Sequence, residues 1–136
     1  MAAKRTILVV EDSPVQALAL QQLLEQKGLK VLRALNGRTG VAMAEQYAPD
    51  AIVLDIQMPE MDGLEACRRL QQNPQTSHIP IVMLTAHAEP EVLAQGLDLG
   101  AVDFIPKDAF SDKVLLETLR QLKVWEDELR GSDAQG

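Results

Sequence analysis

Short apolar runs alternate with longer amphipathic stretches along the chain. Five runs, rich in β-branched and aliphatic residues, predict buried strands, and they cover residues 6–10, 29–35, 51–54, 80–84 and 101–105. The second run carries two basic residues, which favours an edge position in a sheet. Each run is followed by apolar residues at three- and four-residue spacing, which is typical of a helix that packs on one face.

The amphipathic stretches carry signals for helix starts. Ser13 and Pro14 form an N-cap and first-turn pair, which opens the first helix. Asp62, with Glu65 three residues later, resembles a capping box. The other predicted helices cover residues 37–47, 89–99 and 111 to about 129, and the helix that follows Asp62 runs to residue 70. Five strand–helix units predict an α/β protein whose parallel sheet has helices on both faces.

Composition and charge limit the classes of function. A chain of 136 residues suits one domain, expected over residues 5–129, with flexible tails at 1–4 and 130–136. The net charge of −7 argues against nucleic acid or an anionic membrane as the main partner. The single cysteine, Cys67, cannot form an internal disulfide, and we expect it to be a small packed residue. The single cysteine favours a cytosolic compartment, and we find no signal peptide and no apolar run of membrane length, so we expect a cytoplasmic location.

Polar residues follow the predicted strands at the sheet edge where open parallel sheets bind ligands. In chain order these residues are Glu11, Asp12, Asp55, Thr85 and Lys107, and Ala86 follows Thr85 at the end of the fourth strand. Three carboxylates brought together repel one another, and a hard divalent cation such as Mg²⁺ relieves that repulsion. Asp55 can then act as a nucleophile toward phosphorus, while the metal and the lysine neutralise the transferring group.

Five motifs together resemble the receiver domain of two-component response regulators, the CheY-like proteins. The motifs are Ile7-Leu-Val-Val-Glu-Asp-Ser13, Val53-Leu-Asp-Ile-Gln-Met-Pro59, Met61-Asp-Gly63, Met83-Leu-Thr-Ala86 and Asp103-Phe-Ile-Pro-Lys107. The resemblance covers about residues 5–129. It implies a flavodoxin-like sheet of five parallel strands in the order 2-1-3-4-5, with five helices on its two faces.

The resemblance assigns a phosphoacceptor and a metal site to matching residues. It makes Asp55 the phosphoacceptor. The implied metal ligands are Glu11, Asp12, Asp55 and the backbone carbonyl of Gln57. Mg²⁺ is the implied cation, and Mn²⁺ is an alternative. Gln57 and His87 occupy positions whose side chains flank water access in the family, so they are expected to tune the lifetime of the phosphoryl group.

The resemblance also assigns phosphoryl contacts and a switch. Thr85, the backbone N–H of Ala86 and Lys107 match the groups that contact the phosphoryl oxygens. Thr85 and Phe104 match the switch positions, at which a threonine moves toward the phosphoryl group and an aromatic ring turns inward. Lys107 is followed by Asp108, where most relatives have proline in a cis peptide. Because a cis bond before a non-proline residue is costly, this departure predicts a trans peptide, or a cis bond that is retained under strain.

The implied partners are proteins. A histidine kinase or a histidine phosphotransfer protein would donate the phosphoryl group. A downstream protein would bind the face made by helix 4, strand 5 and helix 5, and homodimer formation is a further option. We therefore expect a single-domain response regulator, which is a phosphorylation switch that assists only its own phosphorylation and dephosphorylation, and not an enzyme acting on other substrates.

Other classes of function remain as alternatives. The chain could be the isolated receiver of a hybrid kinase or larger regulator, or a pseudo-receiver that binds proteins without phosphorylation. An aspartyl-phosphate hydrolase is disfavoured because such enzymes need a second Asp two residues after the nucleophile, where this chain has Gln57. A flavin or nucleotide module is disfavoured because the acidic turn at residues 11–14 lacks a glycine to cradle phosphate.

Overall fold

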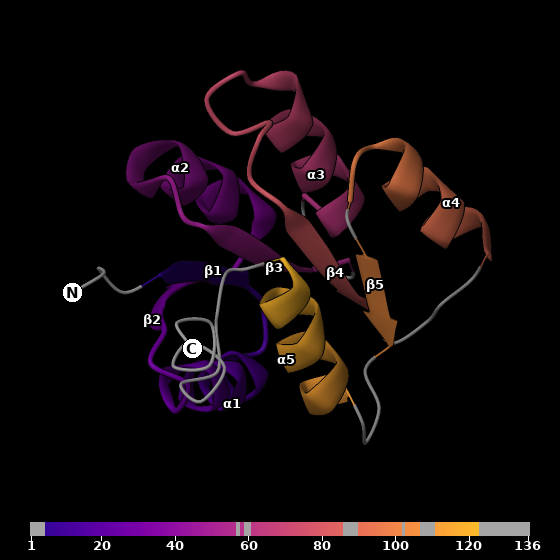
Figure 1. Cartoon of the computed structure of the whole chain (residues 1–136). Coiled ribbons are helices and arrows are strands. Elements are labelled where there is room, and N and C mark those ends of the chain that lie inside the picture. Colours follow the sequence, from indigo (N-terminus) through magenta and orange to yellow (C-terminus); the bar gives the residue numbers. More distant parts are fainter. Residues whose placement is uncertain are drawn as a thin grey trace, which may run out of the picture.

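The computed structural model of the chain describes residues 5–56, 58, 61–85, 90–101, 103–106 and 111–122. Strands and helices alternate along them (Figure 1). The strands are β1 (Thr6–Val10), β2 (Lys30–Ala34), β3 (Ala51–Asp55), β4 (Ile81–Thr85) and β5 (Asp103–Pro106). The helices are α1 (Pro14–Glu25), α2 (Gly37–Tyr47), α3 (Gly63–Gln72), α4 (Pro90–Asp98) and α5 (Ser111–Gln121).

The five strands form one parallel sheet in the order β2-β1-β3-β4-β5. This order confirms the predicted sheet, and it places the second strand at an edge, as its basic residues indicated. The register pairs Val10 of β1 with Leu54 of β3, and Asp55 of β3 with Leu84 of β4. The carboxyl ends of the three central strands therefore lie next to one another.

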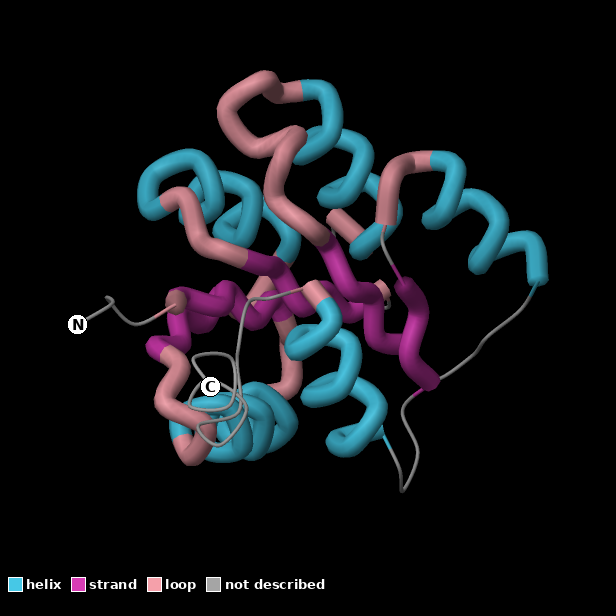
Figure 2. The backbone as a smooth tube through the Cα atoms, viewed as in Figure 1, coloured by secondary structure: helices cyan, strands magenta, loops and turns pink. Residues whose placement is uncertain are grey.

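The sheet has a core on each face, because successive strand residues point to opposite sides. Ile7 and Val9 of β1 pack with residues of α1 and α5, whereas Leu8 and Val10 pack with residues of α2 and α3. Figure 2 shows the same arrangement, with helices on both sides of the strands. Burial on both faces explains why the sequences of the central strands β1, β3 and β4 are apolar over consecutive positions and do not alternate.

Several element boundaries differ from the sequence prediction. β3 and β4 each run one residue further, to Asp55 and Thr85. β5 begins at Asp103 and includes Pro106, whereas residues 101–105 were expected. Pro106 pairs with Thr85 on an edge strand, where the missing N–H of proline is tolerated. α5 ends at Gln121, and the predicted continuation to residue 129 lies outside the described residues.

Cys67 is a packed residue of α3, as predicted. Its side chain is fully buried, and its thiol donates a hydrogen bond to the carbonyl of Leu99, with 3.8 Å between Sγ and O. Burial raises the pKa of the Cys67 thiol from 9.0 to about 11, because the thiolate is poorly solvated inside the protein. The thiol therefore stays protonated until the pH approaches 11.

We expect Cys67 to resist alkylation in the folded protein. The raised pKa alone lowers the thiolate fraction at pH 8 by about 100-fold, and burial slows the reaction further. The rate of iodoacetamide addition, followed by intact mass with and without 8 M urea, checks this. Equal rates in the two conditions would contradict the buried position of the thiol.

Among the described residues, no helix is long and apolar enough to cross a membrane.

Candidate functional site

Three carboxylates meet at the carboxyl ends of β1 and β3. Glu11, Asp12 and Asp55 each contribute one carboxylate oxygen to the cluster, and these three oxygens lie within 4.8 Å of one another. The register explains the cluster, since Glu11 and Asp55 each follow directly on the paired residues Val10 and Leu54. Glu11 and Asp55 are only 1% and 3% exposed, whereas Asp12 is exposed. The structure thus brings together the three acidic residues that the sequence predicted.

The turn that carries the first two carboxylates is held by hydrogen bonds. The backbone N–H of Glu11 donates to the carbonyl of Ala34 in β2, at 3.0 Å. The Glu11 carboxylate accepts from the backbone N–H of Ser13, at 3.2 Å. The Ser13 hydroxyl in turn accepts from the N–H of Gln16, at 3.3 Å, and caps α1 as predicted. The acidic turn is therefore fixed both to the sheet and to the first turn of the helix.

The electrostatics of this cluster favour a bound cation. Two unit negative charges about 5 Å apart repel by about 3 kcal/mol at an effective dielectric constant near 20. Glu11 and Asp55 are buried, so water and salt screen their charges less than those of surface carboxylates. Carboxylate oxygens are the ligands that hard cations such as Mg²⁺ prefer, and the cluster offers no nitrogen or sulfur ligand. The three side chains therefore fit a magnesium-type site, whose cation commonly keeps several waters and shares phosphate oxygens.

The end of β4 lies beside Asp55. The N–H of Ile56, which follows Asp55, donates to the carbonyl of Leu84 at 3.1 Å. Thr85 is the next residue along β4 and pairs with Pro106 of β5. The backbone register therefore orders Asp55, Thr85 and the end of β5 along one edge of the sheet, as the sequence predicted.

The other predicted site groups lie outside the described residues. These are Gln57, Ala86, His87 and Lys107, together with the Lys107–Asp108 peptide and the side chains of Thr85 and Phe104. The backbone of Phe104 is described, and it pairs with Met83 in the sheet. The roles of these groups remain predictions.

Gly63 supports the segment that follows Asp55, and this role of the glycine was not predicted from the sequence. Its N–H donates to the carbonyl of Ile56, the residue after Asp55, at 2.8 Å. A Cβ atom on Gly63 would lie 2.6 Å from Cα of Ile56 and would also overlap the carbonyl oxygen of Asp55. Only glycine allows α3 to begin this close to the acidic site. The signal in the sequence was a glycine placed directly after a helix cap.

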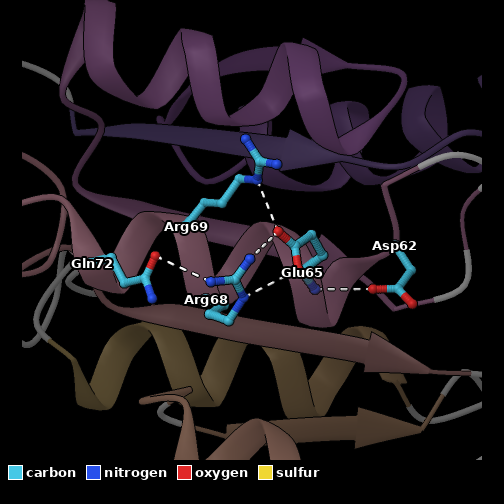
Figure 3. Close-up of polar contacts among 5 residues, drawn as sticks. All are labelled: Asp62, Glu65, Arg68, Arg69 and Gln72. Atoms are coloured by element: carbon cyan, nitrogen blue, oxygen red, sulfur yellow. Dashed lines mark hydrogen bonds and ion pairs between the residues drawn. The ribbon is translucent and has the colours of Figure 1, made fainter.

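The first turn of α3 is fixed by polar contacts (Figure 3). Asp62 accepts a hydrogen bond from the N–H of Glu65 at 2.9 Å, as the capping box predicted. The Glu65 carboxylate accepts from Nε of Arg68 at 3.1 Å and from Nε of Arg69 at 2.9 Å. The hydrogen bond from Arg68 is the largest cause of a lowered pKa of Glu65, and the bond from Arg69 is the next largest. The box is thus only half formed, because the carboxylate binds two nearby cations and does not turn back to the Asp62 amide.

Comparison with known proteins identifies the family. The response regulator receiver domain family matches residues 7–120. Protein PilH of Pseudomonas aeruginosa is 38% identical over 113 residues, which cover 83% of this chain and 93% of PilH. Response regulator PleD of Caulobacter vibrioides is 41% identical over 133 residues, which cover 96% of this chain. The chain spans only 29% of the length of PleD.

A solved structure shows the same fold with a metal ion in its site. The receiver domain of sensor histidine kinase PA1611 from Pseudomonas aeruginosa, solved with a magnesium ion coordinated in its active site cleft, superposes with a TM-score of 0.80 at 31% identity. The match covers 88% of this chain and 98% of that one. The chain belongs to the response regulator receiver domain family of two-component signalling, and its fold is CheY-like. The predicted family and fold class are therefore confirmed.

Proposed function

We propose that this receiver domain is a phosphorylation switch in which Asp55 accepts a phosphoryl group in the presence of Mg²⁺. The observation that carries the proposal is the cluster of Glu11, Asp12 and Asp55, whose carboxylate oxygens lie within 4.8 Å of one another at the end of the sheet. The magnesium ion in the PA1611 receiver supports the choice of metal. Mn²⁺, with its similar preference for oxygen ligands, is the alternative. The backbone carbonyl of Gln57 would complete the protein ligands.

The proposed reaction is a transfer from a phosphohistidine. A carboxylate oxygen of Asp55 attacks phosphorus, the P–N bond to the donor imidazole breaks, and the electron pair of that bond stays with the imidazole. Lys107 would neutralise the oxygens of the transferring group, and the Thr85 hydroxyl and the Ala86 N–H would donate hydrogen bonds to them; a cation held by Glu11, Asp12 and Asp55 would supply further positive charge there. Hydrolysis of the acyl phosphate would regenerate the Asp55 carboxylate and release inorganic phosphate. Gln57 stands where aspartyl-phosphate hydrolases need a second Asp, so the domain would act as a switch and would not turn over other substrates.

The output of the switch is a change of surface. The phosphorylated side chain would carry a charge of about −1.5 to −2 beside the carboxyl end of β4, where the free carboxylate carries a single negative charge. Thr85 and Phe104 would respond by repacking toward it, which couples the site to the face of α4, β5 and α5. Leu97 of α4 and Val114 of α5 are exposed at 54% and 44%, which suits a surface that binds protein. Gln57 and His87 would set how long the signal lasts by controlling water access.

The donor protein would approach from the side of α1. Val15 is 78% exposed and lies three residues after Asp12, and Leu18 on the same helix is also exposed. Exposed apolar residues beside the acidic site provide a contact for a histidine kinase or a phosphotransfer domain. A cytoplasmic location is part of the proposal, because phosphotransfer from an ATP-dependent kinase takes place where ATP is present.

The extent of the protein around this domain is a separate part of the proposal. We place the receiver at residues 5–129 and favour a single-domain regulator, because the match covers 93% of PilH. The match to PleD, of which the chain spans 29%, suits the alternative of a receiver within a larger protein. The mass of the protein detected by a specific antibody in cell extract separates the two.

Intact mass spectrometry tests the proposal. The chain is incubated with acetyl phosphate, with MgCl₂ or with EDTA. We expect the mass of one added phosphoryl group with MgCl₂ and none with EDTA. Absence of the adduct under both conditions, together with absence of beryllofluoride binding, would favour a pseudo-receiver. Beryllofluoride binding without an adduct would indicate a short-lived phosphoryl group.

A further inference from the structure

The N-terminus of α2 contacts the segment that follows Asp55, although α2 contributes no residue to the acidic cluster. A Cβ atom on Gly37, the first residue of α2, would lie 2.5 Å from the carbonyl oxygen of Met61. The same atom would lie 3.1 and 3.2 Å from Cγ and Cβ of Met61. Both Gly37 and Met61 are buried. The close approach is therefore between the backbone of the helix and the backbone of the loop.

Met61 belongs to a loop that is tied to the phosphoacceptor. The N–H of Gly63, two residues after Met61, donates to the carbonyl of Ile56, and Gly63 lies directly against the backbone of Asp55. Two backbone contacts therefore connect α2 to Asp55, one from Gly37 to Met61 and the other from Gly63 to Asp55. The loop between them carries Gln57, whose carbonyl is a proposed metal ligand.

We propose that Gly37 is a positioning residue for the phosphorylation site, because its missing side chain lets α2 hold the loop segment of residues 61–63 against Asp55. This inference rests on the proposed function of Asp55 as the phosphoacceptor. It assigns a role in phosphotransfer to a helix that contributes no carboxylate to the acidic cluster. Figure 1 shows α2 and α3 on the same face of the sheet, with β3 leading into α3.

The surroundings of Met61 determine what a larger side chain at position 37 would do. A cavity of about 500 Å³ opens beside this contact. It is lined by Asn36, Arg38, Thr39, Met61, Glu65 and Arg69. Because Met61 borders this space, a methyl group on residue 37 can push the loop outward without having to unfold the domain. The result is a folded protein whose loop is displaced from Asp55.

We expect Gly37→Ala to weaken Mg²⁺ binding and to slow phosphorylation by acetyl phosphate by about 10- to 100-fold, since a misplacement of about 1 Å can cost about 100-fold in rate. Gly28→Ala is the matched control. Gly28 has a φ of +82° and no atom within 4 Å of its Cβ position, so alanine there strains the backbone far from the loop. The control should keep the Mg²⁺ affinity and the phosphorylation rate of the native chain. Equal values in the two variants would overturn the inference.

Two further variants separate positioning from simple crowding or unfolding. Gly37→Ala/Met61→Ala removes the Cγ contact but keeps the carbonyl contact, so we expect no recovery relative to Gly37→Ala. Recovery to the rate of Met61→Ala would overturn the inference. Asn36→Ala removes the side-chain oxygen that accepts from the N–H of Thr39 at 2.8 Å. This milder loosening of the helix start should slow phosphorylation about threefold, and an unchanged rate would contradict the proposal.

A structural readout keeps this inference distinct from the proposed function. The amide resonance of Ile56 reports the position of the loop whether or not Asp55 accepts a phosphoryl group. A shift of this resonance in Gly37→Ala, and none in Gly28→Ala, supports the contact chain. An unshifted resonance in both variants overturns it, even if the native chain is phosphorylated normally. Failure of the native chain to bind Mg²⁺ or gain a phosphoryl group would instead contradict the proposed function.

Discussion

Asp55→Asn should abolish phosphorylation of the domain. The amide of asparagine is a poor nucleophile toward phosphorus and carries no charge to bind the metal ion, so both the attacking group and one of the three carboxylates are lost. We expect the phosphoryl adduct to fall below about 1% of the level reached by the native chain under the same conditions. Intact mass after incubation with acetyl phosphate and MgCl₂ measures this directly.

The control for this variant is Asp98→Asn. Asp98 is an exposed residue at the end of α4 and is not part of the acidic cluster, so the same chemical change there should leave the adduct at its native level. Circular dichroism must show that both variants are folded. An adduct that persists in Asp55→Asn would mean that another carboxylate accepts the phosphoryl group, with the neighbouring Asp12 as the first candidate.

The fold could be predicted from the sequence because the strands are buried on both faces. Ile7 and Leu8 point to opposite sides of the sheet and are both fully buried, so the sequence shows an unbroken apolar run. The boundaries were less accurate, because strand ends depend on pairing. Thr85 and Pro106 extend β4 and β5 through their contact with each other, which no local pattern records.

The acidic part of the site could be predicted because its residues follow the same apolar runs. Glu11, Asp12 and Asp55 stand directly after apolar runs, so the rule that ligands bind at strand ends brought them together before their geometry was known. The supports of the site could not be found in this way. Gly37 and Met61 are 24 positions apart in the sequence, and their contact depends on how α2 packs beside α3. In the sequence, the only sign of a close approach between two backbones is a glycine. Glycine also occurs for many other reasons, so this sign does not identify the contact.

The acidic cluster also makes a prediction about stability, in which one substitution has two effects of opposite sign. Without metal, Asp12 repels the two buried carboxylates, and Asp12→Asn removes that repulsion. Because Asp12 is exposed, the interaction is screened, and we expect the free energy of unfolding of the metal-free protein to rise by about 1 kcal/mol. Urea unfolding in EDTA measures this, with Asp98→Asn as a control that should change little.

With Mg²⁺ the sign should reverse, because Asp12 then changes from a source of repulsion to a ligand. Loss of a group that only orients a ligand typically weakens a metal site about 10- to 100-fold, so loss of the carboxylate itself should weaken it at least that much. A ligand at 100 times its Kd stabilises the folded state by about 2.7 kcal/mol, and Asp12→Asn should lose most of this gain. The native chain should therefore be the less stable protein in EDTA and the more stable one in MgCl₂, at constant ionic strength.

If the variant kept the Mg²⁺-induced rise in the urea midpoint, Asp12 would not be a metal ligand. If it were destabilised in EDTA as well, the three carboxylates would not repel one another in the folded protein.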